Sequence, residues 1–143
     1  MLANFKAKFG SAMAKFNGRK DFLEAVCAAS ALVASADGEV SDDEIKQTTK
    51  VVSSNPSLQS AFKPRDIESC IDSMLKRAAS GRTGRAGLYK EIEDVKADNT
   101  MSETVYLAAY DIAETDGNIA TKEQEVLSQI AKRLGVNPNV ANV

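Results

Sequence analysis

The chain has 143 residues, a formal net charge of −2, 43% apolar residues and no histidine. This length suits one compact domain with a single core, and no apolar run approaches the roughly 18 residues that a membrane-spanning helix needs. The acidic balance gives no reason to expect a nucleic-acid partner, and no signal-peptide pattern follows the first lysines, so we expect a soluble, cytoplasmic protein.

The N-terminal segment differs in charge from the rest of the chain. Its basic residues, with no acidic residue among the first twenty, are Lys6, Lys8, Lys15, Arg19 and Lys20, which leaves the remainder at −7. Residues 1–18 are therefore predicted to form a basic amphipathic helix, near 2–16, ahead of a domain over 19–143. Its apolar face carries Leu2, Phe5, Phe9, Ala12 and Phe16. Such a face either contacts a membrane surface or covers the protein's own core, and we favour the core.

Further along, apolar residues recur with helical spacing and not with the alternation of strands. The predicted helices lie near 20–36, 41–54, 64–79, 86–97, 101–115 and 121–134. With 2–16 they make an all-α bundle of about seven helices. Capping boxes are predicted at Ser41-x-x-Glu44 and Thr100-x-x-Glu103, a stop at Gly135 and Pro138, and a flexible basic loop over 80–87.

A sequence repeat joins two distant parts of the chain. ASADGEVSDDEIKQ, residues 34–47, aligns with AETDGNIATKEQEV, residues 113–126, at an offset of 79 positions. Each copy reads as a helix, an Asp-Gly turn and a second helix. We therefore predict a pseudo-twofold pair of helix-turn-helix repeats.

The repeat can be laid on half of an EF-hand calcium loop. With Gly38 at loop position 6, Asp37 falls at position 5, the carbonyl of Glu39 at position 7 and Glu44 at position 12. The second copy places Asp116, Asn118 and Glu123 in the same way. Apolar residues, Val33 and Ile112, occupy position 1. About four ligands per copy result, whereas calcium takes about six to eight, so water or acids of the other copy must complete the shell.

Ordinary helix chemistry explains much of the same pattern. Asp37-Gly38 is a common turn pair, and Glu44 can cap its own helix together with Ser41. In the second copy the equivalent N-cap is Ala120, a poor capping residue, so a box of Thr121 with Gln124 is expected and Glu123 is left outside it. Cation binding and plain turn chemistry both stay open.

The stretches SADGEVSDDE, TDGNIATKE and QEVLSQIAKRLGVNP resemble the tellurite-resistance TerB family over most of residues 20–140. The resemblance implies an all-helical, roughly twofold bundle with an acidic cluster that binds divalent cations, calcium foremost. It also implies a cytoplasmic adaptor, without catalysis, that works with other Ter proteins, including a membrane TerC-like protein, in resistance to tellurite, other stresses and phage. Lys122 departs from the acidic pattern of the family and weakens the second half-site.

The candidate metal ligands combine this resemblance with the loop alignment. They are Asp37, Glu39, Asp42, Asp43, Glu44, Glu114, Asp116, Asn118 and Glu123. The alternative to a cation-binding adaptor is a metal-free interaction module whose acidic face meets a basic partner. A metal-dependent hydrolase is formally open but nothing demands it, because the common general base, histidine, is missing. Cys27 and Cys70 are predicted to be buried free thiols with no activating partner.

Overall fold

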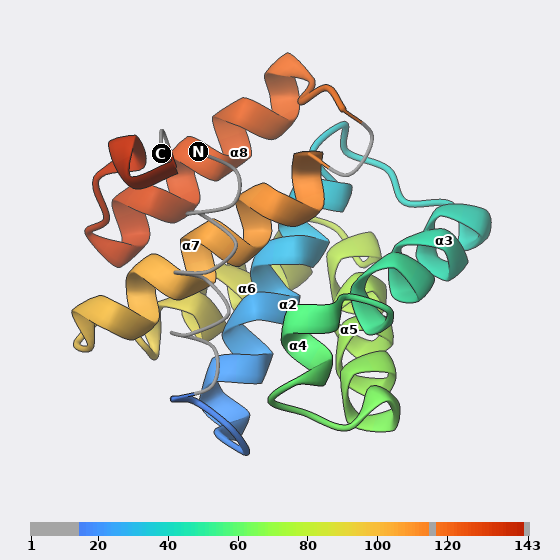
Figure 1. The fold of residues 1–143 in the computed structure, drawn as a ribbon. Helices are drawn as coiled ribbons and strands as arrows, with labels where there is room; N and C mark the ends of the chain where they lie inside the picture. Colours follow the sequence, from blue (N-terminus) through green and yellow to red (C-terminus); the bar gives the residue numbers. More distant parts are fainter. Residues whose placement is uncertain (1–14, 115–116, 142–143) are drawn as a thin grey trace.

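The structure, a computed structural model, describes residues 15–114 and 117–141 (Figure 1). These residues form helices and no strand, which confirms the all-α prediction. The elements are α2 (Lys20–Ala34), α3 (Asp42–Ser53), α4 (Pro56–Gln59), α5 (Pro64–Ala79), α6 (Arg82–Glu93), α7 (Asn99–Ala113), α8 (Thr121–Leu134) and the short 3-10 helix η2 (Pro138–Ala141). No helix in the described part is both long and apolar enough to cross a bilayer.

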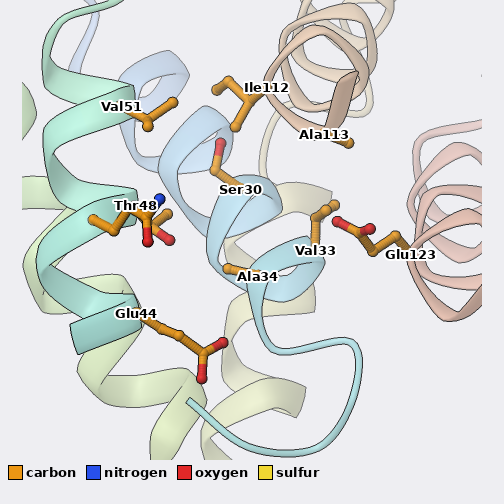
Figure 2. A pocket seen from close by; sticks show the side chains of 10 residues that line it. Ser30, Val33, Ala34, Glu44, Thr48, Val51, Ile112, Ala113 and Glu123 are labelled. Carbon is orange, nitrogen blue, oxygen red and sulfur yellow. The ribbon is translucent and has the colours of Figure 1, made fainter. Parts of the chain in front are cut away.

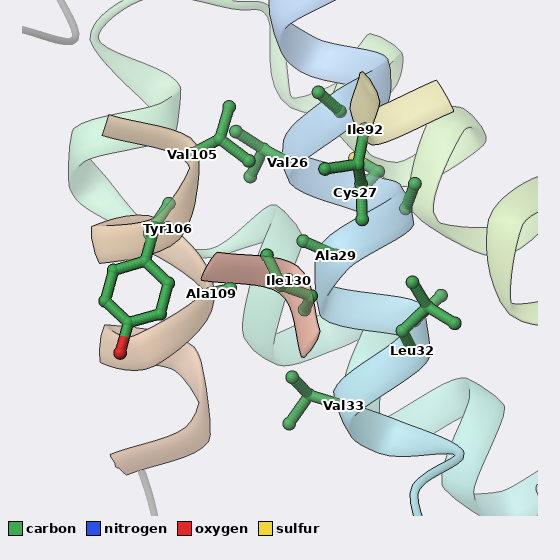
Figure 3. Packing of buried hydrophobic residues seen from close by; sticks show 14 of the residues in the cluster. Val26, Cys27, Ala29, Leu32, Val33, Ile92, Val105, Tyr106, Ala109 and Ile130 are labelled. Carbon is green, nitrogen blue, oxygen red and sulfur yellow. The ribbon is translucent and has the colours of Figure 1, made fainter. Parts of the chain in front are cut away.

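Helix α2 is the centre of the bundle. It packs against α5, α6 and α7 and also touches α8, and eleven of its fifteen residues are buried. Figure 3 shows Val26 beside Val105 of α7, while Cys27 lies on the side of Ile92 of α6. A helix that is apolar on nearly all sides must be surrounded, which is why the Ala- and Val-rich segment takes this position.

Polar caps set several helix starts. Ser41 and Glu44 form the predicted capping box at the start of α3. Asn55 caps α4, which begins with Pro56 and was not predicted from the sequence. Gly135 ends α8 in the left-handed region at a φ of +70°, as the predicted stop requires.

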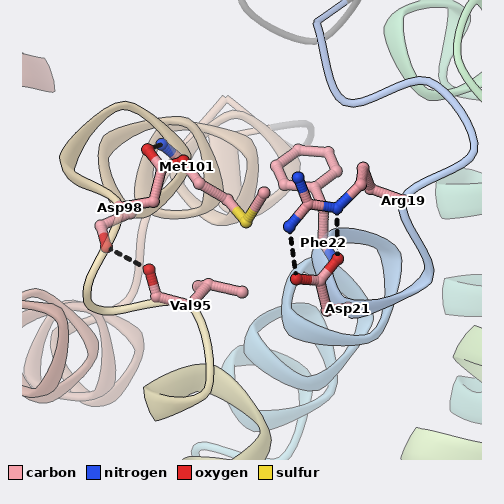
Figure 4. A network of polar contacts seen from close by, with 7 residues as sticks. Arg19, Asp21, Phe22, Val95, Asp98 and Met101 are labelled. Atoms are coloured by element: carbon pink, nitrogen blue, oxygen red, sulfur yellow. Dashed lines mark hydrogen bonds and ion pairs between the residues drawn. The ribbon is translucent and has the colours of Figure 1, made fainter.

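The predicted capping box of Thr100 with Glu103 is wrong. Asp98 is the N-cap of α7, and its carboxylate accepts a hydrogen bond of 3.0 Å from the backbone N–H of Met101 (Figure 4). An aspartate is as good an N-cap as threonine, so α7 starts two residues earlier than predicted. Figure 4 also shows Arg19, just before α2, whose guanidinium donates two hydrogen bonds to the carboxylate of Asp21 in the first turn of α2.

The predicted loop over 80–87 is wrong, and the helix predicted over 86–97 is displaced by four residues, because α6 already begins at Arg82 and ends at Glu93. Gly84 and Gly87 suggested a flexible connector, but both lie inside the helix and face α5. A Cβ atom at Gly84 would come 1.8 Å from the backbone oxygen of Arg77. The glycines therefore permit close packing of two helices.

Most of the predicted helix over 2–16 lies outside the described residues, so the proposed boundary after residue 18 stays a prediction. Its last apolar residue, Phe16, is described and is buried in a turn. The Phe16 ring lies 4.8 Å from that of Phe22, which in turn stacks on Phe62 at 6.1 Å between centroids. This end of the segment thus belongs to the core.

Candidate functional site

The glycines of the two Asp-Gly turns have the same backbone conformation. Gly38 and Gly117 have φ angles of +93° and +85°, a region that favours glycine. The N–H of Gly38 donates to the carbonyl oxygen of Ser35 at 2.9 Å, and the N–H of Gly117 donates to that of Glu114 at 2.8 Å. All these positions are related by the offset of 79, so the repeat extends to hydrogen bonding. The twofold relation of the two units in space stays a prediction.

The two glutamates at the ends of the repeats also have equivalent contacts. Oε1 of Glu44 accepts from the backbone N–H of Ser41 at 3.2 Å and from its hydroxyl at 3.0 Å. Oε1 of Glu123 accepts from the backbone N–H of Ala120 at 3.0 Å. The prediction that Glu123 lies outside its cap is therefore wrong. Ala120 has no capping oxygen, but its own N–H needs an acceptor, and Glu123 supplies it from the third helical position.

One pocket of about 220 Å³ lies between the two repeats (Figure 2). Three pairs of equivalent positions line it: Val33 with Ile112, Ala34 with Ala113, and Glu44 with Glu123. Glu44 comes from α3 and Glu123 from α8, and Figure 2 shows their carboxyl groups on different walls. The structure therefore brings together the two glutamates that the spacing singled out.

Polar residues of α2 and α3 complete the pocket. They are Ser30 on α2 and Gln47 and Thr48 on α3. The Ser30 hydroxyl donates to the carbonyl oxygen of Val26 at 2.8 Å and thus has its partner inside the helix. These three residues were missed from the sequence. Gln47 and Thr48 follow Glu44 by three and four positions, which places them on the same helix face, so this signal was present.

Most other candidate ligands do not line this pocket. Asp37 is exposed and accepts a hydrogen bond of 3.1 Å from the backbone N–H of Glu39, which fixes the turn. The remaining described candidates are exposed in the two turns or at helix ends: Glu39, Asp42, Asp43, Glu114 and Asn118. Asp116 lies outside the described residues.

The described side chains fit a complete cation site only in part. Among residues 15–114 and 117–141, no group of three or more Asp, Glu or Cys side chains lies close enough together to hold a metal ion. The pocket offers two carboxylates, an amide and hydroxyl groups. Calcium takes about six to eight oxygen ligands, so these groups amount to part of a shell.

The fold and the pocket define the class of the protein. It is an all-α bundle with two similar helix-turn-helix units, and the pocket between them is lined by one glutamate from each unit. The family model described as tellurite resistance protein TerB matches residues 23–142, and the chain belongs to this family. The comparison with curated proteins and the comparison with solved structures give no match. The match confirms the resemblance seen in the two acidic turns and in the segment after them.

Proposed function

We propose that this TerB-family protein is a non-enzymatic adaptor that binds a divalent cation, calcium foremost, and acts in tellurite, stress or phage resistance through protein partners. In this proposal the cation lies at the pocket between α3 and α8. The protein works in the cytoplasm, and its partners include other Ter proteins, among them a membrane TerC-like protein. Contact with the inner face of the membrane through residues 2–16 is part of the same proposal.

One observation carries the proposal: Glu44 and Glu123, from separate repeats, line one pocket. A pocket that carries two carboxylates attracts a hard divalent cation, which prefers oxygen ligands. Each glutamate uses Oε1 for its cap, which leaves the second oxygen free for a cation. Asp116 and water would supply further oxygen ligands.

The pocket chemistry favours binding over catalysis. Its described lining combines carboxylates, an amide and hydroxyl groups, and the one serine among them donates to a backbone oxygen. A covalent hydrolase needs a nucleophile within reach of a base that activates it. The serine is thus not poised as a nucleophile, and in this proposal a bound cation serves as a structural or regulatory ligand.

A metal-free interaction module is the second candidate. The caps explain both glutamates without a cation, and acids in the first turn of α3, namely Asp42, Asp43 and Glu44, suit the positive end of a helix. In this case the acidic turns meet a basic partner directly. The two candidates differ in their response to calcium.

We therefore expect calcium to raise the melting temperature of the protein and to give heat in calorimetric titration. Binding to the folded state alone stabilises it by about 2.7 kcal/mol at a hundredfold excess over Kd. Magnesium is expected to act more weakly, because it demands octahedral geometry and releases water reluctantly. Glu44→Gln and Glu123→Gln keep an oxygen for the cap and remove the charge, so each should weaken the calcium response.

Glu125→Gln is the matched control, because Glu125 is exposed on α8 and does not line the pocket. Its calcium response should equal that of the parent. A parent protein that shows neither heat nor a change in melting temperature at millimolar calcium would reject the cation and favour the metal-free module. Loss of the response in Glu44→Gln alone would place the cation on the first turn only.

A further inference from the structure

The pocket between α3 and α8 has an apolar floor that a metal ion does not need. Half of its ten lining residues are apolar, namely Val33, Ala34, Val51, Ile112 and Ala113. An ion held by oxygen ligands at about 2.3–2.6 Å contacts the carboxylates and makes no use of apolar side chains. The volume of about 220 Å³ lies below the roughly 300–1,000 Å³ of pockets for drug-sized ligands. A small organic molecule with an apolar part therefore suits this pocket.

The negative charges of the pocket lie at two separate places. Figure 2 shows Glu44 on α3 and Glu123 on α8, with the part of α2 that carries Val33 and Ala34 between them. No lysine or arginine is among the described residues that line the pocket. Each glutamate uses Oε1 for its cap, so each offers its second carboxylate oxygen to a ligand. The pocket thus presents a carboxylate, an apolar floor and a second carboxylate, in that order.

The wall formed by α3 offers further hydrogen-bond acceptors. Gln47 and Thr48 follow Glu44 by about one helical turn and line the same pocket. An alkylammonium group has three N–H donors. The carboxylate of Glu44, the side-chain carbonyl oxygen of Gln47 and the hydroxyl of Thr48 are three acceptors of the matching kind. Glu123 is the one described residue of α8 in the lining, so we expect the α3 wall to bind an ammonium group more tightly.

We propose that this pocket binds a linear aliphatic diamine, with one ammonium group at Glu44, the other at Glu123 and the methylene chain on the apolar floor. Such a molecule carries two positive charges joined by an apolar chain, which complements the lining in both charge and polarity. A monoamine leaves one of the two carboxylates without a cationic partner. Diamine binding uses the pocket of the proposed function and does not depend on calcium binding there.

The two parts of the ligand are recognised by different forces. Charge-assisted hydrogen bonds fix the ammonium groups at the carboxylates, and removal of the methylene groups from water favours the chain on the apolar floor. The chain length must match the separation of the two carboxylates. A shorter diamine reaches only one glutamate, and a longer one has to bend away from the floor. Calcium and the diamine exclude each other, because both use Glu44 and Glu123.

The test is calorimetric titration of the full chain with a series from diaminopropane to diaminohexane, at constant ionic strength because salt screens exposed charges. The Kd should pass through a minimum at one chain length. Butylamine has a single ammonium group and should bind at least about tenfold more weakly than the best diamine, since one charge-assisted hydrogen bond is lost. Glu123→Gln should remove this difference. Glu125→Gln lies outside the pocket and should keep it.

A second variant separates the diamine from calcium. Val51→Thr keeps the shape of the side chain and places a hydroxyl group on the apolar floor. The diamine should then bind several-fold more weakly, whereas the calcium response of the melting temperature should equal that of the parent. Equal circular dichroism spectra of the variants show that they fold.

The outcomes for the two ligands are distinguishable. Heat on titration with calcium but with none of the diamines would reject the diamine site and leave the cation of the proposed function. Heat with a diamine but not with calcium would reject calcium and support the diamine. A Kd that falls steadily with chain length, a diamine Kd that is the same in Glu123→Gln and the parent, or calcium that binds without raising the apparent Kd of the diamine would each overturn the proposal.

Discussion

Each of the two pocket glutamates uses one of its two carboxylate oxygens to cap its own helix. In both Glu44 and Glu123, Oε1 accepts from the N-cap backbone N–H. An ionised carboxylate accepts about four hydrogen bonds, so one capping bond leaves the other oxygen available. Capping and cation binding are therefore compatible at one residue. A capped glutamate gives a cation a single oxygen more easily than two, so we expect modest affinity.

A different glutamate provides a residue-scale prediction about pH. Nη1 of Arg133 on α8 lies 2.8 Å from Oε1 of Glu93 on α6, and its guanidinium also lies over the ring of Tyr89 at 4.7 Å. The hydrogen bond from Arg133 lowers the pKa of Glu93 below its ordinary value. This ion pair stabilises the fold above the ordinary pKa of a glutamate, about 4.3, and the contribution is lost as the pH falls through the lower, folded-state value.

Arg133→Gln should therefore raise the pKa of Glu93 towards its ordinary value, as measured by NMR titration of the side-chain carboxyl. Lys132→Gln is the control, since Lys132 is exposed on the same helix and has no part in this shift. Its Glu93 pKa should match that of the parent. A Glu93 pKa that is the same in Arg133→Gln and the parent would contradict the assigned cause.

At the scale of helices, apolar periodicity predicted the elements that carry a clear stripe. The ranges 64–79 and 121–134 match α5 and α8, whose buried residues recur every three or four positions. Helix α6 was misplaced by four residues at its start because Gly84 and Gly87 locally resemble a loop. Their role depends on the approach of α5, a contact that local spacing does not encode.

The same limit applies to the candidate sites. Glu44 and Glu123 were found because a repeat places them at equal positions in two turns. The walls of their pocket depend on how α2, α3 and α7 meet, and no local pattern points to Ser30. The prediction that both cysteines are buried is right for Cys27 only, since Cys70 is partly exposed, because burial depends on packing between helices distant in sequence. A local repeat can be recognised in the sequence, whereas the packing of helices that are distant in the sequence cannot.

The two α6 glycines give a prediction for that element. Gly84→Ala should lower the free energy of unfolding by about 1–3 kcal/mol, because overpacking outweighs the gain of about 1 kcal/mol in helix propensity. The new Cβ would meet the backbone of Arg77, which cannot move independently of α5. Urea denaturation measures the difference.

Gly87→Ala is the matched control for that variant. Its Cβ would lie 2.9 Å from Nη2 of Arg77, the far end of a flexible side chain that can shift. We expect its free energy of unfolding to stay within about 1 kcal/mol of the parent. If Gly84→Ala were as stable as Gly87→Ala, close backbone approach of α5 and α6 would not be the reason for glycine at position 84.

At the scale of the whole molecule, charge is unevenly distributed: the first twenty residues are basic and the rest of the chain is acidic. The first twenty residues carry five basic side chains, and the rest of the chain has a net charge of −7. Arg19 is already paired with Asp21 at 2.8 Å, and Phe16 is already buried against Phe22. The described end of the segment is thus part of the fold, so the membrane contact that we propose is limited to the residues before it.

This division predicts different outcomes for two truncations. Removal of residues 2–14 keeps Phe16 and should leave the melting temperature near that of the parent. Removal of residues 2–18 takes Phe16 away, exposes Phe22 and should lower the melting temperature, because burial of a phenylalanine contributes about 1.5–3 kcal/mol. A 2–14 deletion that melts as low as the 2–18 deletion would place the whole segment in the core.

Vesicle binding then tests the membrane contact with the same proteins. On phosphatidylcholine vesicles that contain phosphatidylglycerol, the parent should sediment with the vesicles at low salt and be released at high salt. Each lysine or arginine near an anionic surface contributes about 1 kcal/mol, which added ions screen. The 2–14 deletion removes Lys6 and Lys8 with their apolar face and should not sediment. If it binds as well as the parent, or if binding by the parent ignores salt, residues 2–16 are not a membrane anchor, and any membrane association must come through a protein partner.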